Sequence, residues 1–249
     1  MYIFLKLIRF SQWQKNYLVF LPFIMANEYN FENIYNSAEG FFIFSFAASL
    51  VYIFNDFIDL DKDSKHPSKK YRPLASRSIS KKNAFLIAII FLFLTLYFGY
   101  INQVLAILLV YLILNIFYSF LFKKVRYLDV IILSSFYIVR IYFGGEISNI
   151  EISLWLYIFC SLAFISLVLL KRINEIEKYQ LTNTIYSNKN LKILNIYLKS
   201  SNFLSVVSLI LYLLSDKVFQ IYNFPQFLWL LLPLYIFWMI NINRNALVG

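Results

Sequence analysis

Long apolar stretches separated by short polar segments run through almost the whole chain. A helix needs about 20 mostly apolar residues to cross the ~30 Å hydrocarbon core of a bilayer, and most of these stretches reach or approach that length. The first is the weakest, because only ten apolar residues precede Asn27 and Glu28. We therefore predict eight membrane-spanning helices, at about residues 16–26, 38–56, 84–101, 103–122, 129–147, 153–170, 201–215 and 225–242.

The composition narrows the class of protein. Hydrophobic residues make up 61% of the 249 residues, and charged residues only 14%. A soluble surface takes roughly 25–35% charged residues, so a soluble globular enzyme and a disordered protein are both excluded. A disulfide scaffold is excluded as well, because Cys160 is the only cysteine. The predicted fold is an all-α, polytopic transmembrane bundle that forms a single domain over residues 1–249.

The basic residues are divided unevenly between the two sides of this predicted bundle. Of the 23 Lys and Arg residues, 21 lie before the first span or after the second, fourth, sixth and eighth spans. By the positive-inside rule, both termini and the two longest polar loops, 57–83 and 171–200, are cytoplasmic. The net charge of +10 is then mostly an orientation signal, and we expect no nucleic-acid partner. We expect the two loops to cap one central cavity.

The most specific local feature is a group of acidic side chains at the end of the second predicted span. Four of the 13 acidic residues fall within eight positions, as Asp56, Asp59, Asp61 and Asp63. Asn55, Asp59 and Asp63 are spaced four apart and therefore stack along one helix face. Carboxylates gathered in this way repel one another unless a cation screens them, and such oxygen ligands suit Mg²⁺ bound together with substrate phosphates. The alternative is a solvated helix end.

Basic side chains follow directly on this acidic cluster. Lys65, Lys69 and Arg72 lie within the next ten residues. A metal ion on one side with ammonium and guanidinium groups on the other is an arrangement that holds a diphosphate. His66, the only histidine, is interpreted as a loop or phosphate contact rather than as a general base, because no nucleophile pairs with it.

One arginine lies inside a predicted span. Arg140 falls within residues 129–147, where a buried arginine costs at least about 2.5–3.5 kcal/mol and usually faces a cavity or a partner. Asp129 precedes it by three helical turns on the same face, so both are expected to face one cavity. We interpret Arg140 as a phosphate contact, with a structural pairing to an aspartate as the alternative.

Five short motifs within residues 9–180 match one known family. They are Gln12-Trp13-Gln14-Lys15-Asn16, the run from Asn55 to Pro73, Tyr118-Ser119 with Lys123 and Asp129, Arg140 with Gly144-Gly145, and Lys171-Arg172 with Glu175. On these residues the chain resembles the UbiA-type intramembrane prenyltransferase superfamily, and within it the decaprenyl-phosphate phosphoribosyltransferase branch. The superfamily usually has nine helices, whereas we count eight.

The resemblance implies a multi-pass enzyme of the bacterial inner membrane, with its active site facing the cytoplasm. Such an enzyme transfers 5-phosphoribose from phosphoribosyl diphosphate (PRPP) to a polyprenyl phosphate and releases diphosphate, with Mg²⁺ as the cofactor. The product would be a step towards a lipid-linked pentose donor for cell-envelope polysaccharide. Whether the chain forms a homo-oligomer in the membrane is left open.

The resemblance also implies roles for individual residues. The catalytic residues would be Asn55, Asp56 and Asp59, and the Mg²⁺ ligands would be Asn55, Asp59 and Asp63. Binding of PRPP would involve Lys15, Tyr52, Lys65, Lys69, Arg72, Lys123 and Arg140. Lys171 and Arg172 stand where other members carry a second aspartate motif, and they would hold the lipid phosphate directly. The alternative is that these two residues are only the positive charges that flank a span on its cytoplasmic side.

Two other functions are compatible with parts of this pattern. One is a UbiA-type prenyltransferase that moves a prenyl group from a prenyl diphosphate to an aromatic acceptor, and the missing second carboxylate cluster argues against it. The other is a non-catalytic transporter or lipid scaffold, which would explain the spans and Arg140 but not four aspartates beside a basic loop.

Overall fold

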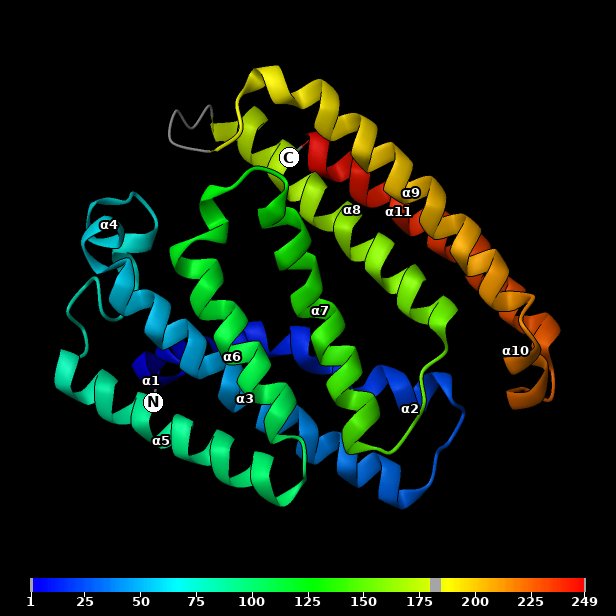
Figure 1. Cartoon of the computed structure of the whole chain (residues 1–249). Coiled ribbons are helices and arrows are strands. Elements are labelled where there is room, and N and C mark those ends of the chain that lie inside the picture. Colours follow the sequence, from blue (N-terminus) through cyan, green and yellow to red (C-terminus); the bar gives the residue numbers. More distant parts are fainter. Residues whose placement is uncertain (1, 180–184, 249) are drawn as a thin grey trace. The chain divides into compact units, whose positions relative to one another are not determined.

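The computed structural model describes residues 2–179 and 185–248, and every regular element in these ranges is helical (Figure 1). The α-helices are α1 (Tyr2–Leu7), α2 (Leu21–Met25), α3 (Phe31–Ile58), α4 (Leu60–Lys65), α5 (Lys81–Ile101), α6 (Leu105–Phe120), α7 (Leu128–Ile147), α8 (Leu154–Tyr179), α9 (Leu191–Leu213), α10 (Asp216–Ile221) and α11 (Leu231–Val248). Five 3₁₀ helices connect or extend them: η1 (Phe10–Phe20), η2 (Lys69–Tyr71), η3 (Phe122–Lys124), η4 (Asn188–Asn190) and η5 (Pro225–Leu230). The all-α prediction is confirmed.

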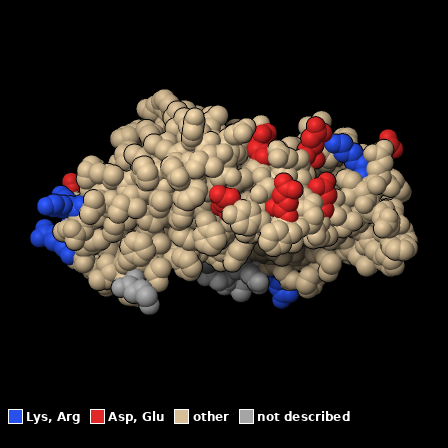
Figure 2. Space-filling model, turned by 90° about the horizontal axis from the view of Figure 1, so that it is seen from below, with Lys and Arg blue, Asp and Glu red and all other residues tan. Residues whose placement is uncertain are grey.

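Seven helical segments of the described chain are long and apolar enough to cross a membrane. They are Phe31–Ile58, Lys81–Ile101, Leu105–Lys124, Leu128–Ile147, Leu154–Glu177, Asn188–Leu213 and Pro225–Arg244. Large apolar side chains on their surfaces, such as Phe93, Phe203 and Phe237, are 63%, 68% and 66% exposed. On the face drawn in Figure 2 most of the surface is uncharged, and Asp and Glu side chains gather in one half of it. The chain is therefore a multi-pass membrane protein, and seven of the eight predicted spans are confirmed.

The prediction of a continuous membrane-spanning helix at residues 16–26 is wrong. That region is divided between the 3₁₀ helix η1 and the short helix α2. Every third residue of η1 is buried, namely Trp13, Asn16 and Val19, which is the period of a 3₁₀ helix. A broken helix of this kind is tolerated at membrane depth only where protein covers it or where it lines a cavity.

The segment that replaces the first predicted span runs antiparallel to α3. The Trp13 indole donates to the Ser49 hydroxyl at 3.0 Å, and Asn16 donates to Ser45, one turn earlier on α3, at 2.9 Å. The segment also packs closely on α7, because a Cβ on Gly144 would lie only 2.2 Å from the Val19 carbonyl oxygen. Small residues on α3 and α7 thus make room for the broken helix.

The second predicted cytoplasmic loop, 171–200, contains the ends of two long helices, and its cytoplasmic location stays a prediction. Helix α8 continues to Tyr179 and α9 begins at Leu191, so most of these polar residues belong to helix ends. The first loop, 57–83, is close to its predicted bounds and contains α4 and η2. Polar composition marked the end of the apolar span in α8 but not the end of the helix itself.

The helices group into two compact units. One comprises residues 1–119 and 139–150, and the other comprises residues 120–138 and 151–249. In the first unit Leu7, Ile53 and Leu74 belong to one buried cluster, and in the second unit Leu169 and Ile173 of α8 pack with residues of α9. The prediction of a single domain over 1–249, with a central cavity, stays a prediction.

Candidate active site at the end of helix α3

The predicted ligand residues lie where α3 passes into α4. Helix α3 ends at Ile58, and Asp59 joins it to α4 with φ −92° and ψ 9°. The helical spacing survives this junction, because the Asp59 amide donates to the Asn55 carbonyl at 2.9 Å and the Asp63 amide donates to the Asp59 carbonyl at 2.8 Å. The structure therefore keeps Asn55, Asp59 and Asp63 on successive turns, as their spacing predicts.

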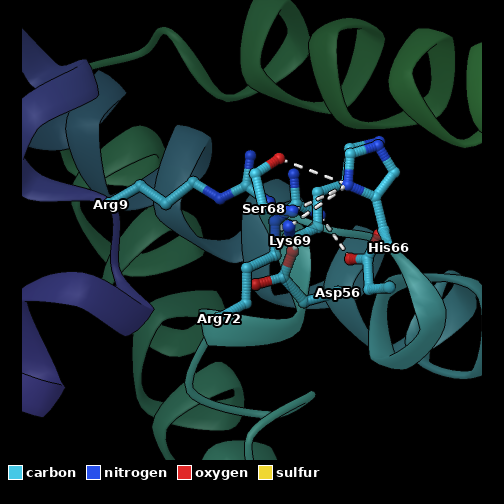
Figure 3. Close-up of polar contacts among 7 residues, drawn as sticks. Arg9, Asp56, His66, Ser68, Lys69 and Arg72 are labelled. Carbon is cyan, nitrogen blue, oxygen red and sulfur yellow. Dashed lines mark hydrogen bonds and ion pairs between the residues drawn. The ribbon is translucent and has the colours of Figure 1, made fainter.

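Asp56 is the buried centre of this site and is only 2% exposed. Its Oδ1 pairs with Arg9 and lies 3.2 Å from Nη1 of Arg72 (Figure 3). The same Arg72 nitrogen lies 2.5 Å from Oδ2 of Asp63. Oδ2 of Asp56 is buried and has no hydrogen-bond partner among the described residues. Because a buried carboxylate oxygen is costly without a partner, this atom is available to a further donor or cation.

Arg9 also belongs to this site, although its sequence position did not predict it. Its guanidinium lies over the Tyr52 ring, 4.7 Å from the ring centroid, in addition to its pairing with Asp56. Its backbone has φ 50°, a left-handed conformation that costs a non-glycine residue of the order of 1–3 kcal/mol. The antiparallel course of the N-terminal segment beside α3 brings Arg9 to Asp56, which lies 47 residues away in the sequence.

Asn55 is held by a neighbouring helix. The Ser119 hydroxyl, at the end of α6, lies 2.5 Å from the Asn55 side-chain oxygen and 2.8 Å from the Asn115 carbonyl. An amide oxygen has two lone pairs, so this contact orients Asn55 and leaves a lone pair for a further ligand. Ser119 belongs to one of the motifs quoted above but was not predicted as a site residue.

The basic part of the loop is more exposed than the acidic part. Lys65 and Lys69 are exposed on the surface. The His66 Nδ1 accepts from the backbone amides of Ser68 and Lys69 at 3.2 and 3.3 Å (Figure 3). His66 therefore shapes the turn that carries Lys69, in agreement with its interpretation as a loop residue.

Arg140, on α7, lies beside the part of α3 that contains Phe44 and not beside the acidic residues at the end of that helix. It is 4% exposed, donates to the Asn16 side-chain oxygen at 2.8 Å, and stands 5.0 Å from the centroid of the Phe44 ring. Phe44 is eleven residues before Asn55 in the same helix, which corresponds to about 16 Å along the axis. The structure thus brings Arg140 to Asn16, the neighbour of half-buried Lys15 on η1, about three turns from the acidic cluster.

A second ionic cluster lies in the other unit. Nε of Arg172 donates to Asp129 at 2.8 Å, and its Nη1 donates to Glu175 at 2.5 Å. The other oxygen of Asp129 accepts from the Tyr186 hydroxyl at 2.5 Å. Burial, followed by this hydrogen bond, raises the pKa of Tyr186 above its ordinary value, so the phenol remains a donor to Asp129 into the alkaline range.

The remaining predicted binding residues differ in accessibility. The Lys171 side chain is 65% exposed and reaches Glu175 only at 3.9 Å. Lys123 is half-buried in η3. Arg172 is held by two carboxylates, so of the pair predicted to bind the lipid phosphate, Lys171 is the more accessible. The predicted shared cavity of Asp129 and Arg140 stays a prediction.

The oxygen donors of the first site fit Mg²⁺ by their chemistry. Among the described residues, no group of three or more His, Cys, Asp or Glu side chains is positioned to hold a metal ion by itself. However, Mg²⁺ is usually bound by one or two carboxylates together with substrate phosphates. That number of carboxylates is available here, from Asp59 and Asp63 beside the Asn55 amide and the unpartnered oxygen of Asp56.

The family follows from comparison with known proteins. The model of the UbiA prenyltransferase family matches residues 17–246, and the chain belongs to this family. A solved UbiA homolog from Archaeoglobus fulgidus, bound to DMAPP and Mg²⁺, shares the fold with a TM-score of 0.75 and 17% identity, over 96% of this chain and 86% of that one. The predicted superfamily is confirmed.

Two relatives illustrate what the chain is similar to. It is 34% identical to the uncharacterized protein y4nM of Sinorhizobium fredii over 168 residues. The aligned region covers 66% of this chain and 33% of that protein. It is 28% identical to a decaprenyl-phosphate phosphoribosyltransferase of Corynebacterium glutamicum over 185 residues. This aligned region covers 72% of this chain and 56% of the enzyme. The matched region thus spans between about a third and somewhat more than half of these relatives.

Proposed function

We propose that this protein transfers 5-phosphoribose from PRPP to a polyprenyl phosphate on the cytoplasmic side of the membrane, with Mg²⁺ as cofactor. The observation that carries the proposal is the buried Asp56, with one unpartnered oxygen and two arginines, beside the aligned Asn55, Asp59 and Asp63. The similarity to a decaprenyl-phosphate phosphoribosyltransferase supports the choice of donor and acceptor.

The diphosphate end of the donor would be held by the basic residues around the aspartates. As the bond between C1 and the diphosphate oxygen breaks, negative charge grows on the leaving group, and Arg72, Lys65 and Lys69 would neutralise it. When bound, Mg²⁺ would supply further charge neutralisation between the carboxylates and the diphosphate. We add Arg9 to this set, because its guanidinium already lies at Asp56.

The two arginines give the site a means of exchanging partners. In the structure they offset the charge of Asp56 and Asp63. Arginine forms bidentate pairs with phosphate as readily as with carboxylate. Arg9 and Arg72 would therefore turn from the aspartates to the incoming diphosphate, and the aspartate oxygens would become available as ligands at the same time.

The acceptor requires no strong general base. The polyprenyl phosphate is already an anion, and its oxygen would form the new bond to C1 as the bond to the diphosphate breaks, through an oxocarbenium-like state. Lys171 would hold the acceptor phosphate and Arg172 would assist it. Lys15, Lys123, Tyr52 and Arg140 would contribute to donor binding as the resemblance implies.

A second candidate is transfer of a prenyl group from a prenyl diphosphate to an aromatic acceptor. The name of the matched family favours it. Against it stands the sequence Lys171-Arg172, where a second carboxylate group would be needed to bind another Mg²⁺.

The proposal is tested by Asp59→Ala, assayed in membranes with a polyprenyl phosphate, Mg²⁺ and labelled PRPP. We expect formation of labelled lipid to fall by at least about 100-fold, the usual effect of removing one group that stabilises transition-state charge. Glu32→Ala is the matched control, because Glu32 is an exposed acid at the opposite end of α3. Undiminished labelling by Asp59→Ala would exclude the assignment.

A further inference from the structure

A pocket lies beside helix α4. It has a volume of about 380 Å³, and its polar lining comes from Asp61, Ser64, Arg77, Ser80 and Lys81. Asp61 and Ser64 stand on a different side of α4 from Asp59 and Asp63, which belong to the acidic site. The short helix α4 is thus a wall shared by two separate sites.

The charges of this pocket favour an anion. Arg77 and Lys81 contribute two positive charges against the single negative charge of Asp61. The structure records no ion pair for Arg77 or Lys81 within the residues it describes, although both line the same cavity. Arg77 also has a left-handed backbone, with φ 58°, which turns the chain back towards the start of α5.

The start of α5 adds to this positive character. Helix α5 is 21 residues long, and Ser80 caps it by accepting from the Asn83 amide at 3.1 Å. Its first turn contains Lys81 and Lys82 and no acidic residue. Since helix N-termini favour negative charge and are disfavoured by cations, an anion in the neighbouring pocket would offset this arrangement.

The pocket is larger than a phosphate group and is apolar on one side. Leu60, Leu74 and Ile79 form part of its lining, and its volume is within the range of about 300–1,000 Å³ that is usual for small-molecule sites. Because α5 is a membrane-spanning helix that begins at Lys81, the pocket is at the level where lipid headgroups meet water. An occupant would therefore combine a phosphate with a less polar remainder.

We propose that this pocket binds the phosphate of a phosphomonoester, through Arg77, Lys81 and the start of α5. The phosphomonoester is either a membrane lipid headgroup or a small soluble ester, since both offer the same recognised group. Ser64 and Ser80 supply hydroxyl donors, and the apolar side receives the remainder of the ligand. This proposal is independent of the transferase reaction, because none of these residues belongs to the acidic site.

The test measures binding to the full-length protein in nanodiscs. In one arm the membrane is phosphatidylcholine and the probe is labelled glycerol 3-phosphate; in the other, the membrane contains phosphatidic acid, and retained lipid is counted by native mass spectrometry. We expect wild type to bind in at least one arm, and the double variant Arg77→Gln, Lys81→Gln to bind at least tenfold more weakly there. Asp61→Asn should bind more tightly than wild type, because it removes the acidic side chain from the described lining of the pocket.

The matched control is the double variant Lys62→Gln, Lys70→Gln, which removes the same charge from exposed positions of residues 57–83 that do not line the pocket. We expect its affinity to stay within about twofold of wild type, with unchanged elution and thermal unfolding for both double variants. The proposal is overturned if neither probe binds wild type, if the pocket variant binds like wild type, or if the control weakens binding equally. The same binding comparison, repeated in Asp59→Ala protein, separates a failure of this proposal from a failure of the proposed transferase function.

Discussion

Two buried aspartates of this protein are each paired with arginine, yet their surroundings differ in one respect. Asp129 uses both carboxylate oxygens, one for Arg172 and one for Tyr186. Asp56 receives Arg9 and Arg72 on a single oxygen, and its other oxygen is without a partner among the described residues. A satisfied ionic cluster is typical of a structural support, whereas an incomplete one costs stability and is typical of a site awaiting a ligand.

The arginines of the two clusters also differ in how firmly they are held. Arg172 sits within α8 and pairs with Glu175 one turn away, so its position is set largely by its own helix. Arg9 and Arg72 come from segments outside α3, and they are 23% and 27% exposed at the side chain. Side chains that extend from connections between helices at the edge of solvent can change partners more easily than those anchored in a helix. We therefore propose that the Asp56 cluster takes part in catalysis, and that Asp129 and Tyr186 support the structure and hold Arg172 in place beside Lys171.

The largest effect is expected from Asp56→Asn. This change keeps the volume of the side chain but leaves Arg9 and Arg72 without their shared carboxylate, so the donor site loses its charge balance. The initial rate of phosphoribosyl transfer should fall by at least about 100-fold. The thermal midpoint in detergent should fall less than in Asp129→Asn, because Arg72 keeps its pairing with Asp63 and both arginines are partly exposed to solvent. A variant that retains near wild-type transfer would place the reaction elsewhere.

Asp129→Asn should have the opposite profile. Removing one partner of a buried ion pair costs about 3–5 kcal/mol when the other charge is left uncompensated, although Glu175 remains beside Arg172 and places the expected loss at the low end. The measurement is the thermal midpoint of the purified protein, together with its specific activity below that midpoint. If stability is unchanged and activity is abolished, the distinction between the two clusters fails.

The smallest effect is expected from Tyr186→Phe, which keeps the ion pair of Asp129 with Arg172. It removes the hydrogen bond to the charged Asp129, worth about 1.5–3 kcal/mol, and the one that the hydroxyl accepts from the Tyr127 amide at 2.7 Å. Because the pKa of Tyr186 is raised in the folded protein above the ordinary value of 10.0, its contribution is fully present below that value and is lost as pH rises through the folded pKa. Thermal unfolding followed from pH 7 to 11 should therefore show a steeper alkaline decline for wild type than for Tyr186→Phe. Parallel declines would contradict the role of this phenol.

The sequence predicted local features well and long-range contacts poorly. The alignment of Asn55, Asp59 and Asp63 depends only on helical spacing, and it is present in the structure. Arg9 was missed because its partner lies 47 positions away, and no periodicity within either segment connects them. The broken first helix was missed because its geometry depends on the close approach of Val19 to Gly144, which is a property of packing rather than of hydropathy.

The same limit applies to the second cluster. Lys171 and Arg172 were interpreted alike, as two adjacent cations near a membrane surface. The structure separates them, because Arg172 turns towards Asp129 while Lys171 stays exposed. Which of two neighbouring side chains faces inward follows from the partner that another helix provides, and that partner is 43 residues away.

The most direct test of the central claim is mass spectrometry of the lipid product. Purified protein, Mg²⁺ and a polyprenyl phosphate would be incubated with PRPP, and in parallel a prenyl diphosphate would be supplied with an aromatic acceptor. We predict a lipid whose mass equals that of the polyprenyl phosphate plus one phosphoribosyl group, formed only with PRPP and lost in Asp59→Ala. A prenylated aromatic product, with no change in the polyprenyl phosphate in the presence of PRPP, would contradict the proposed function.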